Sequence, residues 1–303
     1  MKATGSIRVK SVLVVVLAVA MLNTTGCCDA MHAASNGRTG DSLVVRQKED
    51  VIGTIADGYI AIVNSTFLTG QAAEWNPSSL SRASEVYQDA VMNSDHGYVS
   101  RRKGFGSLSR WAQAMGITPA PEECRTGCKF AGGSIRLMHN PNLVGDNATW
   151  YETPLGSFPA ITVGGADGYM TDLEHAYHEL AHIWDGAHHW TWGTELDQAM
   201  EVKREANGTL IFDEALKAAR DRHGDFATSR TDPADPRMPH GCEHFAETVL
   251  AYFLTDVPDY SGLFHVCWAD EDPQCGAKFE YDRYDFVRDL VLHTDADHQM
   301  GVK

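Results

Sequence analysis

Two histidines and a glutamate near the middle of the chain have the spacing of a metal site. They occur in the pentapeptide His178-Glu179-Leu180-Ala181-His182. On an α-helix, residues four apart lie about 40° from each other, so both imidazoles can reach one ion, whereas neighbours lie about 100° apart. Glu179 is therefore placed to hold a water bound to that ion and to accept its proton. Zinc lowers the pKa of such a water from 15.7 to about 7, which favours hydrolysis of a carbonyl compound.

The residues around this pentapeptide predict the helix that carries it. Thr171 and Glu174 have the spacing of a capping box, in which each side chain bonds the backbone amide of the other. A helix is therefore expected to begin near Asp172. Gly186 is its expected C-terminal stop, because glycine readily adopts the left-handed conformation found there.

Histidine pairs four residues apart are not specific by themselves, since His240 and His244 form a second one. The glutamate directly after the first histidine makes the earlier pattern specific. On a capped helix that follows a short sheet, this pattern resembles the zincin metallopeptidases. A third ligand is then needed. The segment from Glu243 to Glu247 resembles the gluzincin branch, and in particular the catalytic domain of anthrax lethal factor and its bacterial relatives.

This resemblance implies that Glu243 completes the site for one zinc ion per chain, and that Glu247 supports a zinc-bound histidine from outside. Asp185, three residues after the second histidine, matches an acidic residue of that family and is implied to act in the same way. The family also carries a tyrosine shortly before the glutamate ligand to stabilise the oxyanion. This chain has no tyrosine between residues 227 and 242, so His240 is the alternative catalytic donor.

Other ligand sets remain open. Metzincins continue the motif as His-Glu-x-x-His-x-x-Gly-x-x-His, and His188 occupies the last position, although Asp185 stands where glycine is expected. His189 offers nearly the same geometry, shifted by one residue. Asp197 faintly resembles the aspartate ligand of the aspzincins, whose spacing is not reproduced. A non-catalytic zinc-binding surface protein is the alternative from another class, and Glu179 argues against it, because a structural zinc site needs no base.

The elements that must position these residues indicate an α+β fold. Apolar residues with helical spacing predict an N-terminal helical layer, and short alternating segments predict a small sheet over the active-site helix. The resemblance to zincins implies such an architecture, in which an edge strand can pair with an extended peptide. The predicted helices cover residues 50–67, 80–92, 108–115, 213–222, 243–254 and 281–292, and the predicted strands cover residues 134–138 and 160–163.

Charge and the N-terminus restrict the partners. The 303 residues include 25 Lys and Arg against 41 Asp and Glu, a net charge of −16, which excludes a nucleic-acid partner and leaves a peptide or protein substrate. Lys2 and Arg8 precede the apolar run of residues 12–22, which is too short to span a bilayer and is typical of a secretory signal. The sequence Thr-Thr-Gly before Cys27 resembles a bacterial lipobox, so the membrane is contacted only through a possible lipid anchor there.

These observations divide the chain into four parts. We expect a signal peptide over residues 1–26, a linker over 27–48, an N-terminal helical region over 49–133 and a zinc metallopeptidase domain over 134–303. The seven cysteines fit a secreted or otherwise extracytoplasmic protein. Cys124 with Cys128, and Cys267 with Cys275, are close enough in sequence for two local disulfides. Cys242 is left over, as a disulfide partner or a buried thiol.

Export has a direct test. Protein isolated from the native host should lack Met1, because the signal peptide is removed on secretion. Mass spectrometry of the mature N-terminus measures this, and radiolabelled palmitate on Cys27 would distinguish the lipoprotein from the soluble secreted form. Cytosolic protein with an intact Met1 would contradict the prediction.

Overall fold

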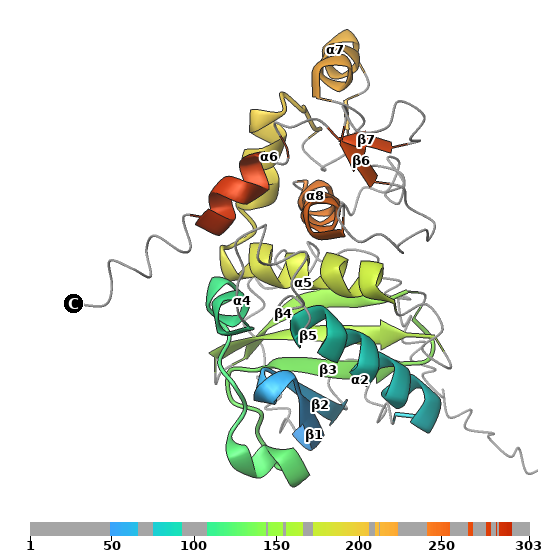
Figure 1. Cartoon of the computed structure of the whole chain (residues 1–303), viewed down its shortest axis with the longest axis vertical. Helices are drawn as coiled ribbons and strands as arrows, with labels where there is room; N and C mark the ends of the chain where they lie inside the picture. Colours follow the sequence, from blue (N-terminus) through green and yellow to red (C-terminus); the bar gives the residue numbers. More distant parts are fainter. Residues whose placement is uncertain are drawn as a thin grey trace, which may run out of the picture.

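The computed structural model describes residues 49–65, 75–92, 108–143, 145–153, 156–165, 172–205, 210–211, 213–223, 241–254, 266–268, 277–279, 283 and 285–292. These residues form a mixed α/β structure with a small sheet, compatible with the expected α+β class (Figure 1). Among them, no helix has both the length and the apolar character needed to cross a membrane. The predicted signal peptide and linker, with Cys27, lie outside the described residues.

Five strands form one mixed sheet in the spatial order β1-β2-β3-β5-β4. The three central strands β2, β3 and β5 are parallel to one another. The edge strand β1 is antiparallel to β2, and the other edge strand β4 is antiparallel to β5. β3 and β5 confirm the two strands predicted at residues 134–138 and 160–163. The bounds are β1 (Glu49–Ile55), β2 (Ile60–Ser65), β3 (Ile135–Asn140), β4 (Asn147–Thr153) and β5 (Gly156–Gly164), and a separate parallel pair is β6 (Val266–Trp268) with β7 (Ala277–Phe279).

The helix expected over residues 50–67 is wrong, because its described part, residues 50–65, forms most of β1 and all of β2, joined through a short 3-10 turn at Ala56–Gly58. Residues 60–63 of β2 are all buried, with Ile60 in the larger apolar core and Ala61 in a smaller one on the other face. A strand that buries both faces carries consecutive apolar residues rather than alternating ones. The segment predicted as helical therefore supplies the first two strands of the sheet.

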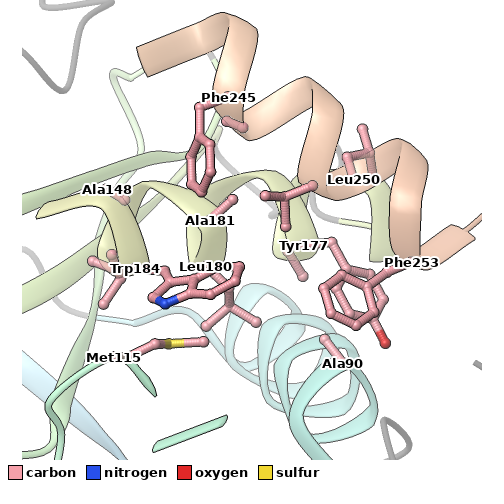
Figure 2. Close-up of a cluster of buried hydrophobic side chains, with 14 of the residues drawn as sticks. Ala90, Met115, Ala148, Tyr177, Leu180, Ala181, Trp184, Phe245, Leu250 and Phe253 are labelled. Carbon is pink, nitrogen blue, oxygen red and sulfur yellow. The ribbon is translucent and has the colours of Figure 1, made fainter. Parts of the chain in front are cut away.

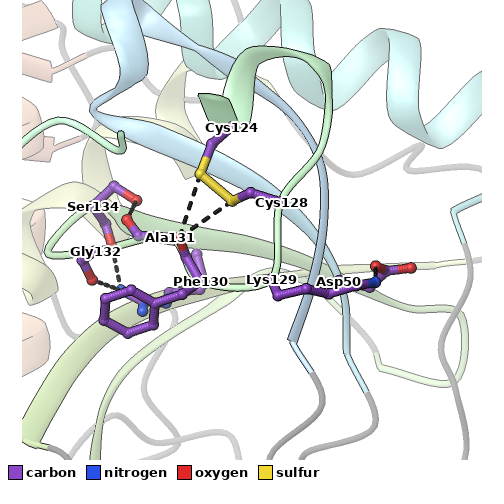
Figure 3. The surroundings of a disulfide bond; sticks show 9 residues. Asp50, Cys124, Cys128, Lys129, Phe130, Ala131, Gly132 and Ser134 are labelled. Atoms are coloured by element: carbon purple, nitrogen blue, oxygen red, sulfur yellow. Dashed lines mark hydrogen bonds and ion pairs between the residues drawn. A yellow bond between two sulfur atoms is a disulfide. The ribbon is translucent and has the colours of Figure 1, made fainter. Parts of the chain in front are cut away.

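A loop closed by a disulfide covers part of the outer edge of β1. Val51 exchanges two backbone hydrogen bonds with Cys128, at N to O distances of 3.0 and 3.1 Å. Cys128 is bonded to Cys124, and Lys129 forms an ion pair with Asp50 (Figure 3). The loop satisfies backbone groups that an open sheet edge would expose.

The disulfide between Cys124 and Cys128 confirms the first predicted pair. Cys242, which was left over in the predicted pairing, is also disulfide-bonded. The pair predicted between Cys267 and Cys275 involves side chains outside the described part of the structure.

Several helices confirm the sequence patterns. α2 (Pro77–Met92), α4 (Leu108–Ala114), α7 (Glu214–His223) and α8 (Cys242–Leu254) match four of the predicted helices, and residues 283 and 285–292 are helical as expected. α5 (Leu173–Ala187) carries the His-Glu-x-x-His pentapeptide and packs against β4, α2 and α8. In Figure 1 it lies between the sheet and α8. α6 (Trp192–Ala199), which was not predicted, packs against α8.

α5 is buried on every side, and an apolar stripe along it forms the centre of the larger core. The ring of Trp184 lies 5.8 Å from that of Phe245, and Tyr177 stacks on Phe253 at 5.7 Å. Figure 2 shows these residues, with Leu180, between α8 and the α2 and α4 side of the core. Residues 176–185 are all buried, so the polar residues of α5 are buried as well as the apolar ones.

Both ends of α5 differ in detail from the prediction. The N-cap is Asp172, whose Oδ1 accepts a hydrogen bond from the backbone N–H of His175 at 3.0 Å, and Thr171 lies outside the described residues. The helix does not stop at Gly186 but continues to Ala187.

Gly186 is required for close packing rather than for a turn. A Cβ atom there would overlap the indole of Trp150 and lie 2.9 Å from Cζ2 of Trp190. Trp150 cannot easily move away, because its Nε1 donates to the carbonyl oxygen of Ile183 at 3.1 Å. The glycine therefore lets β4 approach the helix.

Replacing Gly186 with alanine should destabilise the fold. Alanine gains about 1 kcal/mol of helix propensity, but overpacking against two indoles typically costs about 1–3 kcal/mol, occasionally more. Urea denaturation should show a net loss, whereas Gly53→Ala should change the free energy of unfolding little, because a Cβ at Gly53 would meet no atom within 4 Å. Equal stability of the two variants would contradict this account of Gly186.

Candidate metal centre

Three side chains from two helices converge on one point. The Nε2 atoms of His178 and His182, both on α5, lie 3.0 Å apart. Glu243, in the first turn of α8, places Oε2 3.1 Å from Nε2 of His178 and Oε1 3.3 Å from Nε2 of His182. Among the described residues, these three form the one group of His, Cys, Asp and Glu side chains close enough to hold a metal ion.

The distances suit a zinc ion. Zinc binds imidazole nitrogen at about 2.0–2.1 Å and carboxylate oxygen at about 2.0–2.2 Å, and a tetrahedral arrangement then separates two ligand atoms by roughly 3.3 Å. The three separations of 3.0, 3.1 and 3.3 Å are close to this value. Two imidazole nitrogens that face each other at 3.0 Å cannot both carry a proton, so a cation between them is favourable.

Burial and charge act on this cluster in opposite directions. Burial alone would lower the pKa of His178, but the adjacent carboxylates of Glu243 and Glu247 raise that pKa well above its ordinary value. Burial would raise the pKa of Glu243, yet the two histidines hold it well below its ordinary value. Glu243 is therefore ionised at neutral pH, as a metal ligand must be.

Glu247 lies one helical turn after Glu243 on α8. Its Oε1 is 3.0 Å from Nδ1 of His178, the ring nitrogen that faces away from the cluster. The contact has the distance of an ion pair. A carboxylate in this position can hold a ligating histidine in the required tautomer and orientation.

Glu179 is buried beside the cluster, with 5% of its surface exposed. Its Oε2 has no hydrogen-bond partner among the described residues. Burial raises the pKa of this carboxylate, and so do the charges of Asp146 and Glu243, while His178 and His182 lower it. The net increase makes Glu179 a stronger base than an exposed carboxylate.

Asp185 connects α5 to α6. Its Oδ1 accepts the backbone N–H of Trp192, the first residue of α6, at 3.0 Å. Burial raises the pKa of Asp185 to about 6, against the opposing effects of His182 and of the Trp192 and Gly193 amides. Oδ2 of Asp185 and Nδ1 of His182 are both buried, and neither makes a hydrogen bond in the described part of the chain. The role that the resemblance implied for Asp185, support of a zinc-bound histidine, therefore stays a prediction.

The alternative ligands lie elsewhere. His188 is exposed, stacks on Trp192 with ring centroids 3.8 Å apart, and directs Nε2 towards the carbonyl oxygen of Ala114 at 3.3 Å. His189 is exposed and has a positive φ of 60°. Asp197 bonds Nδ1 of His244 at 2.9 Å. In the described residues, none of the three candidate ligands belongs to the converging group.

Two partly buried polar contacts near the site have no signal in the sequence. Tyr87 on α2 donates its hydroxyl to Oδ2 of Asp146 at 3.0 Å, and Oδ1 of Asp146 accepts the amide of Gly164 at 3.1 Å. Tyr87 and Asp146 are both close enough to Glu179 to interact with it electrostatically. The sequence separation of 59 residues between Tyr87 and Asp146 explains why spacing rules did not find the pair. His240, the proposed oxyanion donor, lies outside the described residues.

No protein-family model, no curated protein and no solved structure matches this chain. The site is therefore interpreted from its own residues.

We expect one zinc ion per chain. Replacing His178, His182 or Glu243 with alanine should abolish tight binding, because two protein ligands are too few. Glu247→Ala should weaken binding by about 10–100-fold, as is typical for groups that orient a metal ligand. Atomic emission spectrometry of the dialysed variants measures the zinc content.

His188→Ala and His189→Ala are the matched controls and should keep their zinc. If these two variants lose the metal while Glu243→Ala retains it, the metzincin ligand set is the correct one.

Proposed function

We propose that this chain is an exported zinc-dependent endopeptidase of the gluzincin type. The observation that carries the proposal is the convergence of His178, His182 and Glu243 at separations that suit one zinc ion. The mixed sheet, with the helix of the His-Glu-x-x-His motif packed against an edge strand, supports a zincin-like architecture. The Cys124–Cys128 disulfide supports an oxidising compartment.

Glu179 is the residue that would move protons. When held by the two histidines and Glu243, zinc would supply a Lewis acid that polarises a carbonyl and lowers the pKa of water to about 7. Glu179 accepts a proton from the water while the oxygen of that water attacks the peptide carbonyl. Glu179 then delivers that proton to the nitrogen of the departing amine as the carbon–nitrogen bond breaks.

The substrate would lie along β4. One side of this strand pairs with β5, and no other strand pairs with its outer side among the described residues. An extended peptide can add to such an edge through backbone hydrogen bonds. The indole of Trp150 on β4 donates to the backbone of Ile183 on α5, which fixes the edge next to the helix that carries Glu179. His240 is our proposed donor to the oxyanion.

Glu179→Gln tests the catalytic assignment. The amide has the same shape and can hydrogen-bond a water but cannot accept its proton, so hydrolysis of casein should fall by about 10²–10⁴-fold while the zinc content is unchanged. Glu195→Gln is the matched control: it makes the same chemical change on an exposed residue of α6 and should keep full activity.

A chelator should abolish the activity of the wild-type protein, and added zinc should restore it. Zinc binding without any casein hydrolysis would favour the non-catalytic zinc-binding alternative. Near-normal turnover in Glu179→Gln would show that another group is the base.

A further inference from the structure

A buried polar network joins α6 to the beginning of α8. Asp197 on α6 accepts the Nδ1 proton of His244 at 2.9 Å, and Arg204 forms an ion pair with the same carboxylate. Asp197 and His244 are 6% and 2% exposed. Burial disfavours the charged form of Asp197, but His244 and Arg204 outweigh this effect and lower its pKa. A buried carboxylate with two such partners is held in one position.

The backbones of the two helices also touch at this point. A Cβ at Gly193 of α6 would lie 2.7 Å from the backbone N of Cys242, and a Cβ at Gly241 would overlap the carboxylate of Asp197. Gly241 has a φ of +74° and accepts the Phe245 amide at 2.9 Å in the first turn of α8. Asp197 therefore lies against the N-terminus of α8, where a negative charge is favourable.

His244 directly follows Glu243 on α8. The contact of His244 with Asp197 therefore determines the direction in which the Glu243 side chain points. Neighbouring side chains on a helix point about 100° apart, and they extend roughly 5–6 Å from its axis. A rotation of α8 by about 20° would move the Glu243 carboxylate by about 2 Å. Metal ligands must be placed within about 0.2 Å. The bond from His244 to Asp197 opposes such a rotation.

We infer that Asp197 is a positioning residue for the third metal ligand: through His244 it fixes the rotation of α8 that directs Glu243 towards His178 and His182. This inference rests on the proposed function for its metal, but it concerns residues outside the metal ligands. It also gives a role to the buried pair of Asp197 and His244 and to the partly buried Arg204, none of which belongs to the converging group.

Asp197→Ala tests the inference, with zinc affinity measured by competition against a chromophoric chelator. We expect a loss of about tenfold, at the lower end of the range for residues that support metal ligands. Asp197→Asn keeps an oxygen that can accept the His244 proton, so its zinc affinity should stay within about threefold of the wild type. In the Co²⁺-substituted protein, Asp197→Ala should alter the visible absorption, which reports the coordination geometry.

Two controls separate positioning from general destabilisation. Leu196→Ala removes a fully buried side chain from the same helix and should lower the melting temperature of the apo protein without a tenfold loss of zinc affinity. Glu195→Ala removes one exposed negative charge two residues away and should change neither property.

The inference is wrong if Asp197→Ala binds zinc as tightly as Glu195→Ala does. It is also wrong if Leu196→Ala and Asp197→Ala lower the melting temperature equally and lose equal amounts of zinc affinity. A wild-type chain that binds no zinc would instead refute the proposed function, so the two failures are distinguishable.

Discussion

The structure depends on a helix that is buried on every side, so that its polar residues are buried along with its apolar ones. Between residues 176 and 185, α5 buries two histidines, a glutamate and an aspartate. Buried polar groups are unfavourable unless other groups pair with them. The backbone N–H and C=O groups of α5 are already paired with each other, so partners for its polar side chains must come from other elements. The demand for partners therefore constrains how α6 and α8 can pack against α5.

The contacts form a closed circuit around the candidate metal centre. Glu243 and Glu247 of α8 meet His178 directly. Asp185 of α5 accepts a hydrogen bond from the first amide of α6. Asp197 of α6 accepts one from His244 of α8. Each helix is thus tied to the other two by at least one buried carboxylate. Such a circuit places ligands from two helices more accurately than apolar packing alone, which has no directional preference.

The parts of this fold that could be predicted from the sequence are those determined by local pattern. α2, α5 and α8 have long helical periodicity, and β3 and β5 have short alternating or β-branched runs with breakers on either side. The failure over β2 has a physical cause: a strand buried on both faces has the same consecutive apolar residues as a buried segment of helix. Pairing with β1 on one side and with β3 on the other identifies it as β structure. α6 was missed because its N-terminal amide is capped by Asp185 rather than by a local residue.

The candidate site divides in the same way. His178, Glu179 and His182 lie within five residues, and Glu243 and Glu247 within another five, so helical spacing was enough to propose them. Asp197 was noticed for the wrong reason, as a potential ligand, because its true contact is with a histidine 47 residues later. The pair of Tyr87 and Asp146 depends on the docking of α2 against the start of β4. Motifs therefore identify groups that line the candidate metal centre, whereas groups that hold them in place become visible only after the helices and strands have packed.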